Sequence, residues 1–311
     1  MSKMSDMNRA PRRLPLVCRL VLGSCAWMLW IVVIGCATNP YTQRTQFVLV
    51  PDSFLNEIAA QQYEQVLSDP KIVISQDPRE VEPVKRVAAR IIEAAKHSKY
   101  AETAKQFDWE VTVIKDDQTK NAWALPGGKI AVYTGMFPIA KNEAGLAVVL
   151  GHEVVHALAK HGAERMSQAL VAQFGMAAAS IVLSAQGLSP ELHRLALQAI
   201  GLGAQVGVIL PFSRRHESEA DYVGLLLAAQ AGYDPREAVR LWERMAQASQ
   251  GREPPEFLST HPSHQTRIAD LQRWMPEALV LYQQAPKAPV ADLPSISADP
   301  PPSVSRSANG Q

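Results

Sequence analysis

Leu146-Ala147-Val148-Val149-Leu150-Gly151-His152-Glu153-Val154-Val155-His156-Ala157-Leu158-Ala159 is the stretch that decides the fold of this chain. A helix with apolar residues on nearly every side is buried inside a domain. Four residues advance a helix by about 400°, so His152 and His156 lie one turn apart on the same face. Two histidines and Glu153 would be costly to bury without partners, and a shared metal ion removes that cost. The stretch therefore predicts a central helix that carries a metal site.

The order H-E-x-x-H supplies the residue types that a hydrolytic metal site needs. Neutral imidazoles suit zinc, and Glu153 is placed to take a proton from water whose pKa the metal lowers to about 7. We predict one Zn²⁺ per chain, although histidine and carboxylate ligands also accept cobalt or manganese in vitro. The alternative is a helix whose histidines face solvent or a polar partner, and the apolar surroundings argue against it.

A third ligand must come from elsewhere, and residues 214–221, Arg-Arg-His-Glu-Ser-Glu-Ala-Asp, are the richest source. Glu217 and Asp221 are four residues apart on a predicted helix, so one can bind the metal while the other supports a ligand histidine. The spacing alone does not distinguish Glu217, Glu219 and Asp221. A solvated, charged helix face is the alternative, but the apolar residues 223–227 follow directly.

The remaining sequence predicts an α+β fold that is mainly helical. Amphipathic spacing indicates helices from Asp52 to about Leu67, from Asp77 onward and from Asp234 onward. Alternating residues predict short strands, which form a small mixed sheet beside the metal-binding helix. The strands of this sheet are expected at residues 109–114 and 129–134, and a further short strand is expected at residues 46–50.

Two apolar segments, Ala169–Gln186 and Leu192–Leu210, are joined by a turn and predict a helical hairpin. Each is about as long as a membrane span, but polar insertions such as His193 and Arg194 are expensive in lipid. We expect the hairpin to pack over the core, where it touches a membrane or covers the cleft. A pair of membrane spans is the alternative.

The N-terminus indicates export. Basic residues precede an apolar run from Leu20 to Ile34, as in a secretory signal, and the run ends at Gly35-Cys36 in a pattern that resembles the bacterial lipobox. We expect a lipoprotein signal peptide at residues 1–35, cleaved before Cys36, whose acyl chains anchor the protein to the membrane. Ala37 in place of Asp implies the periplasmic face of the outer membrane of a Gram-negative-type bacterium. An uncleaved N-terminal membrane helix is the alternative.

Composition sets further limits. The 311 residues include 31 Lys and Arg and 30 Asp and Glu, and a formal charge of +1 argues against nucleic-acid binding through a basic surface. The three cysteines are Cys18, Cys25 and Cys36, so no thiol follows residue 36 and a disulfide scaffold is excluded there. From residue 285 the chain is rich in Pro, Ala and Ser. This predicts a disordered tail at 285–311 and a folded domain at 36–284.

Four motifs, in this order along the chain, resemble a known family. They are Asn121-Ala122-Trp123 with Pro126-Gly127-Gly128, H-E-x-x-H at 152–156, E-x-E-A-D at 217–221, and His261-Pro262 followed by Arg267. Over residues 37–275 the chain is similar to the gluzincin zinc metallopeptidases of the CAAX prenyl endopeptidase and HtpX type. The periplasmic lipoprotein branch, with BepA-like and LoiP-like proteases, fits best.

The resemblance implies a residue for each role. His152, His156 and Glu217 would bind zinc, Glu153 would be the general base, and Asp221 would support a ligand histidine. The resemblance also places His261 near the metal, where it steadies the transition state or caps the zinc in a latent form. A histidine in a surface loop is the alternative. The remaining histidines, His97, His161, His193, His216 and His264, are expected to be structural or solvated.

Two features near the cleft stay open. Gly128–Thr134 would be its edge strand, to which an extended substrate adds by main-chain pairing, and an internal strand is the alternative. Arg267 would either orient the His261 loop or pair with an acid.

The predicted function is a membrane-anchored periplasmic zinc endopeptidase that hydrolyses misfolded or stalled envelope and outer-membrane proteins. The alternative is an assembly factor that works with the outer-membrane protein assembly machinery and has a latent or structural zinc site. Glu153 favours the enzyme, because a structural site does not need that carboxylate. A third interpretation, an intramembrane prenyl-protein protease, requires the hairpin to span the bilayer.

Overall fold

The computed structural model describes residues 36–186, 188–205, 210–248, 256–261 and 266–296, so the predicted signal peptide lies outside it. The chain folds around the helix α6 (Glu143–Leu158), in which every residue except His156 is buried. Asn142 caps its N-terminus by accepting a hydrogen bond from the backbone of Gly145. Lys160, with a left-handed φ of 57°, then joins α6 to α7 (His161–Ala185). The predicted central helix is confirmed.

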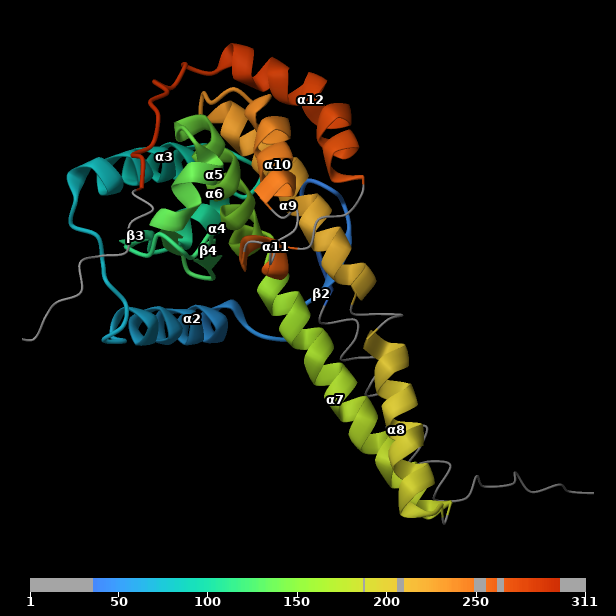
Figure 1. Cartoon of the computed structure of the whole chain (residues 1–311). Helices are drawn as coiled ribbons and strands as arrows, with labels where there is room; N and C mark the ends of the chain where they lie inside the picture. The colour runs from blue at the N-terminus through green and yellow to red at the C-terminus, as the bar shows by residue number, and fades with distance from the viewer. Residues whose placement is uncertain (1–35, 187, 206–209, 249–255, 262–265, 297–311) are drawn as a thin grey trace, which may run out of the picture.

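A three-stranded sheet lies against α6, with the order β3 (Glu110–Ile114), β5 (Lys129–Tyr133) and β4 (Ala122–Leu125). β5 is parallel to β3 and antiparallel to β4. One face of the sheet carries α3 (Pro78–Lys96) and α6, and the other carries α2 (Asp52–Leu67) (Figure 1). The mainly helical α+β fold with its small mixed sheet agrees with the prediction.

The edge strand beside α6 is β4, and β5 is central, so the prediction that residues 128–134 form the edge is wrong. Gly127 and Gly128 have φ angles of 83° and 95°. These left-handed angles, which glycine adopts at little cost, fold β4 back onto the outer side of β5. β4 has only four residues, too few for an alternating pattern to be visible in the sequence.

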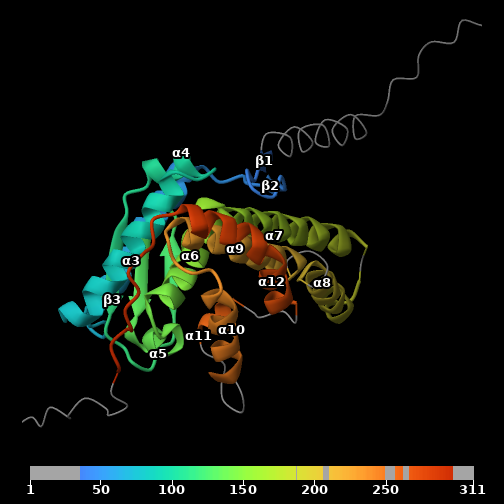
Figure 2. The ribbon, with the colours of Figure 1, turned by 90° about the horizontal axis from the view of Figure 1, so that it is seen from above.

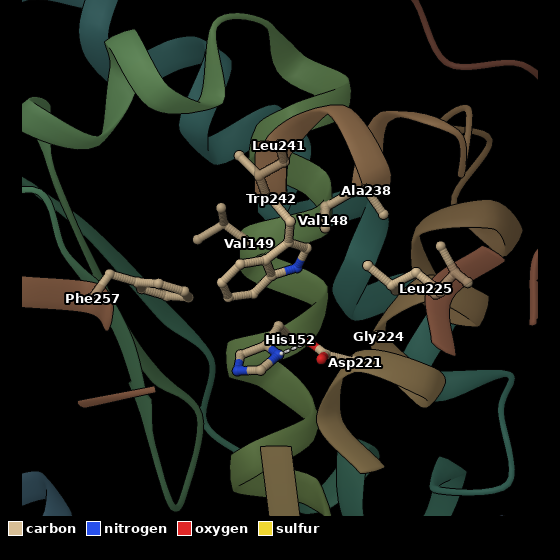
Figure 3. A pocket seen from close by; sticks show the side chains of 11 residues that line it. Val148, Val149, His152, Asp221, Gly224, Leu225, Ala238, Leu241, Trp242 and Phe257 are labelled. Atoms are coloured by element: carbon tan, nitrogen blue, oxygen red, sulfur yellow. Dashed lines mark hydrogen bonds and ion pairs between the residues drawn. The ribbon is translucent and has the colours of Figure 1, made fainter. Parts of the chain in front are cut away.

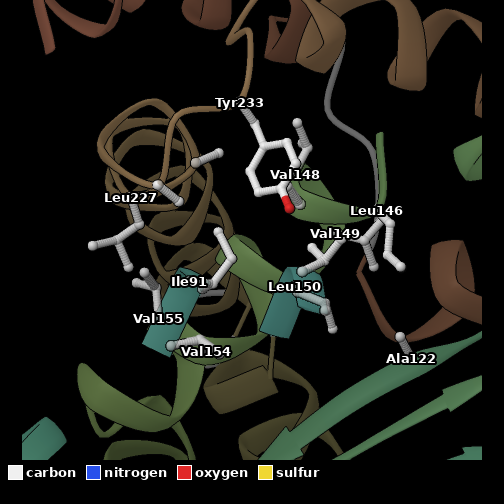
Figure 4. Close-up of a cluster of buried hydrophobic side chains, with 14 of the residues drawn as sticks. Ile91, Ala122, Leu146, Val148, Val149, Leu150, Val154, Val155, Leu227 and Tyr233 are labelled. Atoms are coloured by element: carbon white, nitrogen blue, oxygen red, sulfur yellow. The ribbon is translucent and has the colours of Figure 1, made fainter. Parts of the chain in front are cut away.

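Further helices complete the wall around α6. α9 (Leu210–Gln230) lies across α6, and α12 (Arg267–Gln284) packs on α9. Figure 4 shows their shared core, in which Ile91 of α3, Leu150 of α6 and Leu227 of α9 meet. The other elements are β1 (Cys36–Thr38), β2 (Thr45–Phe47), α4 (Ala101–Gln106), the 3-10 helix η1 (Thr134–Met136), α5 (Phe137–Ala140), α8 (Pro190–Ala204), α10 (Glu237–Ala248) and α11 (Glu256–Thr260).

The hairpin of α7 and α8 projects away from the rest of the molecule (Figures 1 and 2). Phe174 and Ile181 are each 72% exposed, and Leu202 is 66% exposed. By length and composition α7 could cross a membrane, and only 6% of its most apolar stretch is buried. The prediction that the hairpin packs over the core is therefore wrong. The surface of α6 is already enclosed by the sheet, α3 and α9, which leaves no apolar face for the hairpin to cover.

The segment after α12 returns to the domain. Ala288 donates a backbone hydrogen bond to Gly232, and Leu293 donates one to Lys141 and is buried. The prediction of a disordered tail is thus wrong for residues 285–296, because main-chain pairing and Leu293 supply order that composition does not reveal. Residues 297–311 lie outside the described part of the chain.

Candidate metal centre

Helices α6 and α9 bring the three predicted ligands together. Nε2 of His152 lies 3.0 Å from Nε2 of His156 and 3.4 Å from Oε2 of Glu217. Nε2 of His156 is 3.4 Å from Oε1 of Glu217. With His261, these residues place one possible donor atom each within 4.8 Å of one another. They form a compact group of nitrogen and oxygen donors.

His261 enters this group from the end of α11. Its Nδ1 lies 3.2 Å from Nε2 of His152 and 3.1 Å from Oε1 of Glu217, and its Nε2 lies 3.3 Å from Oε1 of Glu153. The ring stacks on Phe257, one turn earlier, with ring centroids 4.7 Å apart. The alternative of a histidine in a remote surface loop does not describe this position.

Asp221 and Arg267 form hydrogen bonds with two of the possible metal ligands, His152 and Glu217. Nδ1 of His152 is 2.9 Å from Oδ1 of Asp221, as Figure 3 shows. Arg267 is buried and donates to Oδ2 of Asp221 at 2.5 Å and to Oε2 of Glu217 at 2.9 Å. Its guanidinium lies 3.8 Å from the ring centre of Trp242. Arg267 thus pairs with two acids at once, which the sequence left undecided.

Glu153 is buried beside the edge strand β4. Among the described residues its Oε1 accepts no hydrogen bond, while the backbone of Ala124 donates one to the carboxylate. Burial raises the pKa of Glu153 above its usual value, and this effect outweighs the opposing charges of His261 and His152. A carboxylate with a raised pKa accepts a proton more readily near neutral pH.

The donor atoms fit zinc. Asp221 accepts the Nδ1 proton of His152, and Nε2 of that ring faces His156. Burial opposes protonation of His152, but hydrogen bonds with Asp221 and Glu217 outweigh it and raise the pKa of the ring to about 10, so zinc would take the place of a proton on Nε2. Burial lowers the pKa of His156 well below its usual value, so the ring of His156 is neutral. Burial opposes ionisation of Glu217, but contacts with His152 and His261 outweigh it and hold the pKa of the carboxyl well below its usual range. Lone pairs that converge in this way repel one another unless a cation lies between them, and nitrogen with carboxylate oxygen is a common zinc set.

A second buried cluster lies behind His156, and we call it the buried polar network. Its five members are Arg44, His161, Glu164, His216 and Glu219. Arg44 donates to Glu164 and Glu219, each at 2.8 Å. His161 pairs with Glu219 at 2.8 Å, and His216 pairs with Glu164 at 2.9 Å.

Sequence reasoning assigned no role to this network. Its acids and His216 look like part of a charged helix, and His161 like one more histidine after the motif. The available signal was the position of His161, five residues after His156. Of the remaining histidines, His97 is exposed, His193 contacts Ser180 and His264 lies outside the described residues.

Comparisons with known proteins agree with this chemistry. The sequence profile of Peptidase family M48 matches residues 78–275. The mitochondrial metalloendopeptidase OMA1 of Schizosaccharomyces pombe is 40% identical over 78% of this chain and 67% of its own length. Its human counterpart is 30% identical over 88% of this chain and 53% of its own length. The beta-barrel assembly-enhancing protease of Escherichia coli is 32% identical over 51% of this chain and 32% of its own length.

These similarities contradict the predicted function and location. The relatives that match most of the chain are mitochondrial metalloendopeptidases, whereas the beta-barrel assembly-enhancing proteases match about half of it. The prediction of a periplasmic quality-control protease at a bacterial outer membrane is therefore wrong. The sequence misleads because residues 1–35, rich in Arg and poor in acids, combine features shared by secretory signals and organelle transit peptides.

Proposed function

Because the chain belongs to peptidase family M48 and is a zinc-dependent metalloendopeptidase with protein substrates, we propose that His152, His156 and Glu217 hold its zinc ion. Glu153 is the general base, and Asp221 fixes the ring of His152. The observation that carries this assignment is the convergence of four donor atoms within 4.8 Å beside a buried carboxylate oxygen that accepts no hydrogen bond in the described part of the chain.

Different residues of the chain have different roles in peptide hydrolysis. When bound, zinc supplies Lewis acidity and makes water more acidic. Glu153 accepts the proton of the attacking water and delivers it to the amine that leaves. Arg267 holds the carboxylates of Glu217 and Asp221 in place through its two hydrogen bonds.

An extended substrate fits beside β4. This strand is at the edge of the sheet and its Ala124 contacts the general base. A substrate strand that pairs with β4 would place its main chain next to Glu153 with little dependence on side chains. The cleft would therefore favour unfolded or locally unfolded protein segments.

We propose a mitochondrial location, because the relatives that match most of the chain are mitochondrial metalloendopeptidases. The exposed apolar hairpin supports contact with a membrane, since α7 is long and apolar enough to cross one and only 6% of its most apolar stretch is buried. The start of the folded domain at residue 36 stays a proposal.

The test is cleavage of a denatured, fluorescently labelled protein by the full chain, with and without a chelator. Glu153→Gln should lower turnover by about 10²–10⁴-fold while zinc stays bound, because it removes only the base. Glu93→Gln, an exposed position on α3, is the matched control and should cleave like wild type. Equal cleavage by Glu153→Gln and wild type would show that the catalytic assignment is wrong.

A further inference from the structure

The two ligand histidines are held in different ways. Nδ1 of His152 contacts a carboxylate directly, that of Asp221. Nδ1 of His156 instead faces another imidazole, with Nδ1 of His161 at 3.0 Å. His161 is fully buried, and its Nε2 lies 2.8 Å from Oε2 of Glu219. The carboxylate of Glu219 therefore contacts His156 only through the ring of His161.

The hydrogen bonds assign the protons along this chain of groups. The carboxylate of Glu219 accepts from Arg44 and from the hydroxyl of Thr42, so it has no proton to give. Its partner nitrogen, Nε2 of His161, must then carry the proton. A neutral His161 has its lone pair on Nδ1 and accepts the Nδ1 proton of His156. His156 is left with a lone pair on Nε2, the atom that faces His152.

We propose that His161 is a positioning residue that fixes the tautomer and the ring orientation of the ligand His156, with Glu219 as its anchor. The inference rests on the zinc site proposed above. It gives each acid of residues 217–221 a separate role. Glu217 binds the metal, and Asp221 fixes the orientation of His152 directly. Glu219 fixes the orientation of His156 through His161.

The surroundings of His161 restrict its rotation, as a positioning residue requires. Its ring stacks on His216 with centroids 4.4 Å apart and an angle of 15° between the planes. Glu219, the carboxylate that His161 contacts, is fixed in turn by Arg44. His161 therefore presents Nδ1 to His156 in one orientation.

Three variants of the full chain test the proposal. His161→Phe keeps a ring on His216 but removes both nitrogens. His161→Asn keeps an oxygen that can accept from His156 but loses the bond to Glu219. His216→Phe is the matched control, since it keeps a ring on His161 and removes a buried hydrogen bond in the same network without touching His156.

The measurements are the zinc dissociation constant, from competition with a chelator, and the visible absorption spectrum of the cobalt form. We expect His161→Phe to weaken zinc binding by about 10–100-fold, the range for partners that support metal ligands, and to alter the cobalt spectrum. His161→Asn should fall between this variant and wild type, and His216→Phe should stay within about twofold of wild type. A dissociation constant for His161→Phe within about twofold of wild type overturns the proposal, as does an equal loss in His216→Phe.

Circular dichroism checks that each variant is folded. If His161→Phe is not folded, His161→Asn alone decides, and a wild-type zinc affinity with an unchanged cobalt spectrum overturns the proposal. Wild type provides the reference for the site itself. Zinc binding and cleavage by wild type with no effect of either His161 variant would reject only this inference, whereas wild type that binds no zinc would reject the proposed function.

Discussion

Gly151 of α6 and Gly224 of α9 face each other with no side chain between the two helices. A Cβ atom on Gly151 would lie 2.7 Å from the carbonyl oxygen of Gly224, and one on Gly224 would lie 2.8 Å from the backbone nitrogen of His152. These distances are too short for any real contact, so two glycines are needed for the helices to approach this closely. That approach sets the separation between Glu217 on α9 and the two histidines on α6.

Gly224→Ala should separate the helices. We expect a loss of about 1–3 kcal/mol in the free energy of unfolding, the usual cost of overpacking, together with weaker zinc binding because Glu217 moves with α9. Denaturant unfolding and chelator competition measure the two effects. Gly203→Ala, in a helix with nothing near the new methyl group, is the control: it should leave zinc binding unchanged and should not lower the free energy of unfolding, because Ala favours a helix over Gly. Unchanged zinc affinity in a destabilised Gly224→Ala protein would show that the crossing does not set the site.

Arg267→Lys tests the contact with two acids. A lysine keeps the charge but cannot reach Asp221 and Glu217 with the planar fork of a guanidinium. We expect kcat to fall at least tenfold with a smaller change in KM, because the substrate does not touch Arg267. Arg240→Lys, at an exposed arginine that pairs with Glu237, is the control and should resemble wild type. A kcat equal to that of wild type in Arg267→Lys would show that catalysis does not require a guanidinium that contacts both acids.

His261→Ala tests whether His261 occupies the metal position that the attacking water needs. Four protein donors are typical of structural zinc sites, and three with an open position are typical of catalytic ones. We expect His261→Ala to cleave a denatured protein faster than wild type at equal zinc content. Slower cleavage would instead indicate that His261 acts on the transition state.

Acid should weaken the buried polar network. Burial raises the pKa of Glu164, but hydrogen bonds from His216 and Arg44 outweigh it and lower the pKa to about 2. The ionised carboxylate therefore stabilises the folded state above pH 4.5, the usual pKa of Glu, and this contribution is lost as the pH falls towards 2. Glu164→Gln should be less stable than wild type at pH 7, and the difference should shrink as the pH falls from 4.5 to 2. Urea unfolding at several pH values measures it, and a difference that does not vary with pH would contradict this account.

Membrane contact through the hairpin predicts that the protein binds lipid vesicles. Phe174→Ser with Ile181→Ser removes two large exposed apolar groups from α7 and should reduce the fraction that sediments with phosphatidylcholine vesicles. Phe54→Ser, at an exposed apolar position on α2, is the control. Cleavage of a soluble denatured substrate should be unchanged in the double variant. Equal sedimentation of wild type and the double variant would exclude the hairpin as the membrane contact.

Much of the centre could be predicted because it depends on local periodicity. The spacing of His152 and His156 and their apolar surroundings determine both burial and a shared face. The same holds for α3, since the sequence predicts a helix from Asp77 onward and α3 begins at Pro78 with Asp77 as its cap.

The remainder depends on contacts between distant segments. The edge position of β4 follows from how a four-residue strand folds back, and the order in residues 285–296 follows from pairing with loops over 50 residues away in the chain. The link between His161 and Glu219 likewise joins two helices whose separate sequences contain no sign of it. No periodicity within one segment reveals such pairs.

The position of His161 has a mechanical consequence. It is the first residue of α7, a rod of 25 residues whose base touches a zinc ligand and whose far end stands clear of the protein. A rod fixed at its base converts sideways displacement of its tip into torque at the base. Displacement of the exposed hairpin would therefore act on the imidazole that contacts His156.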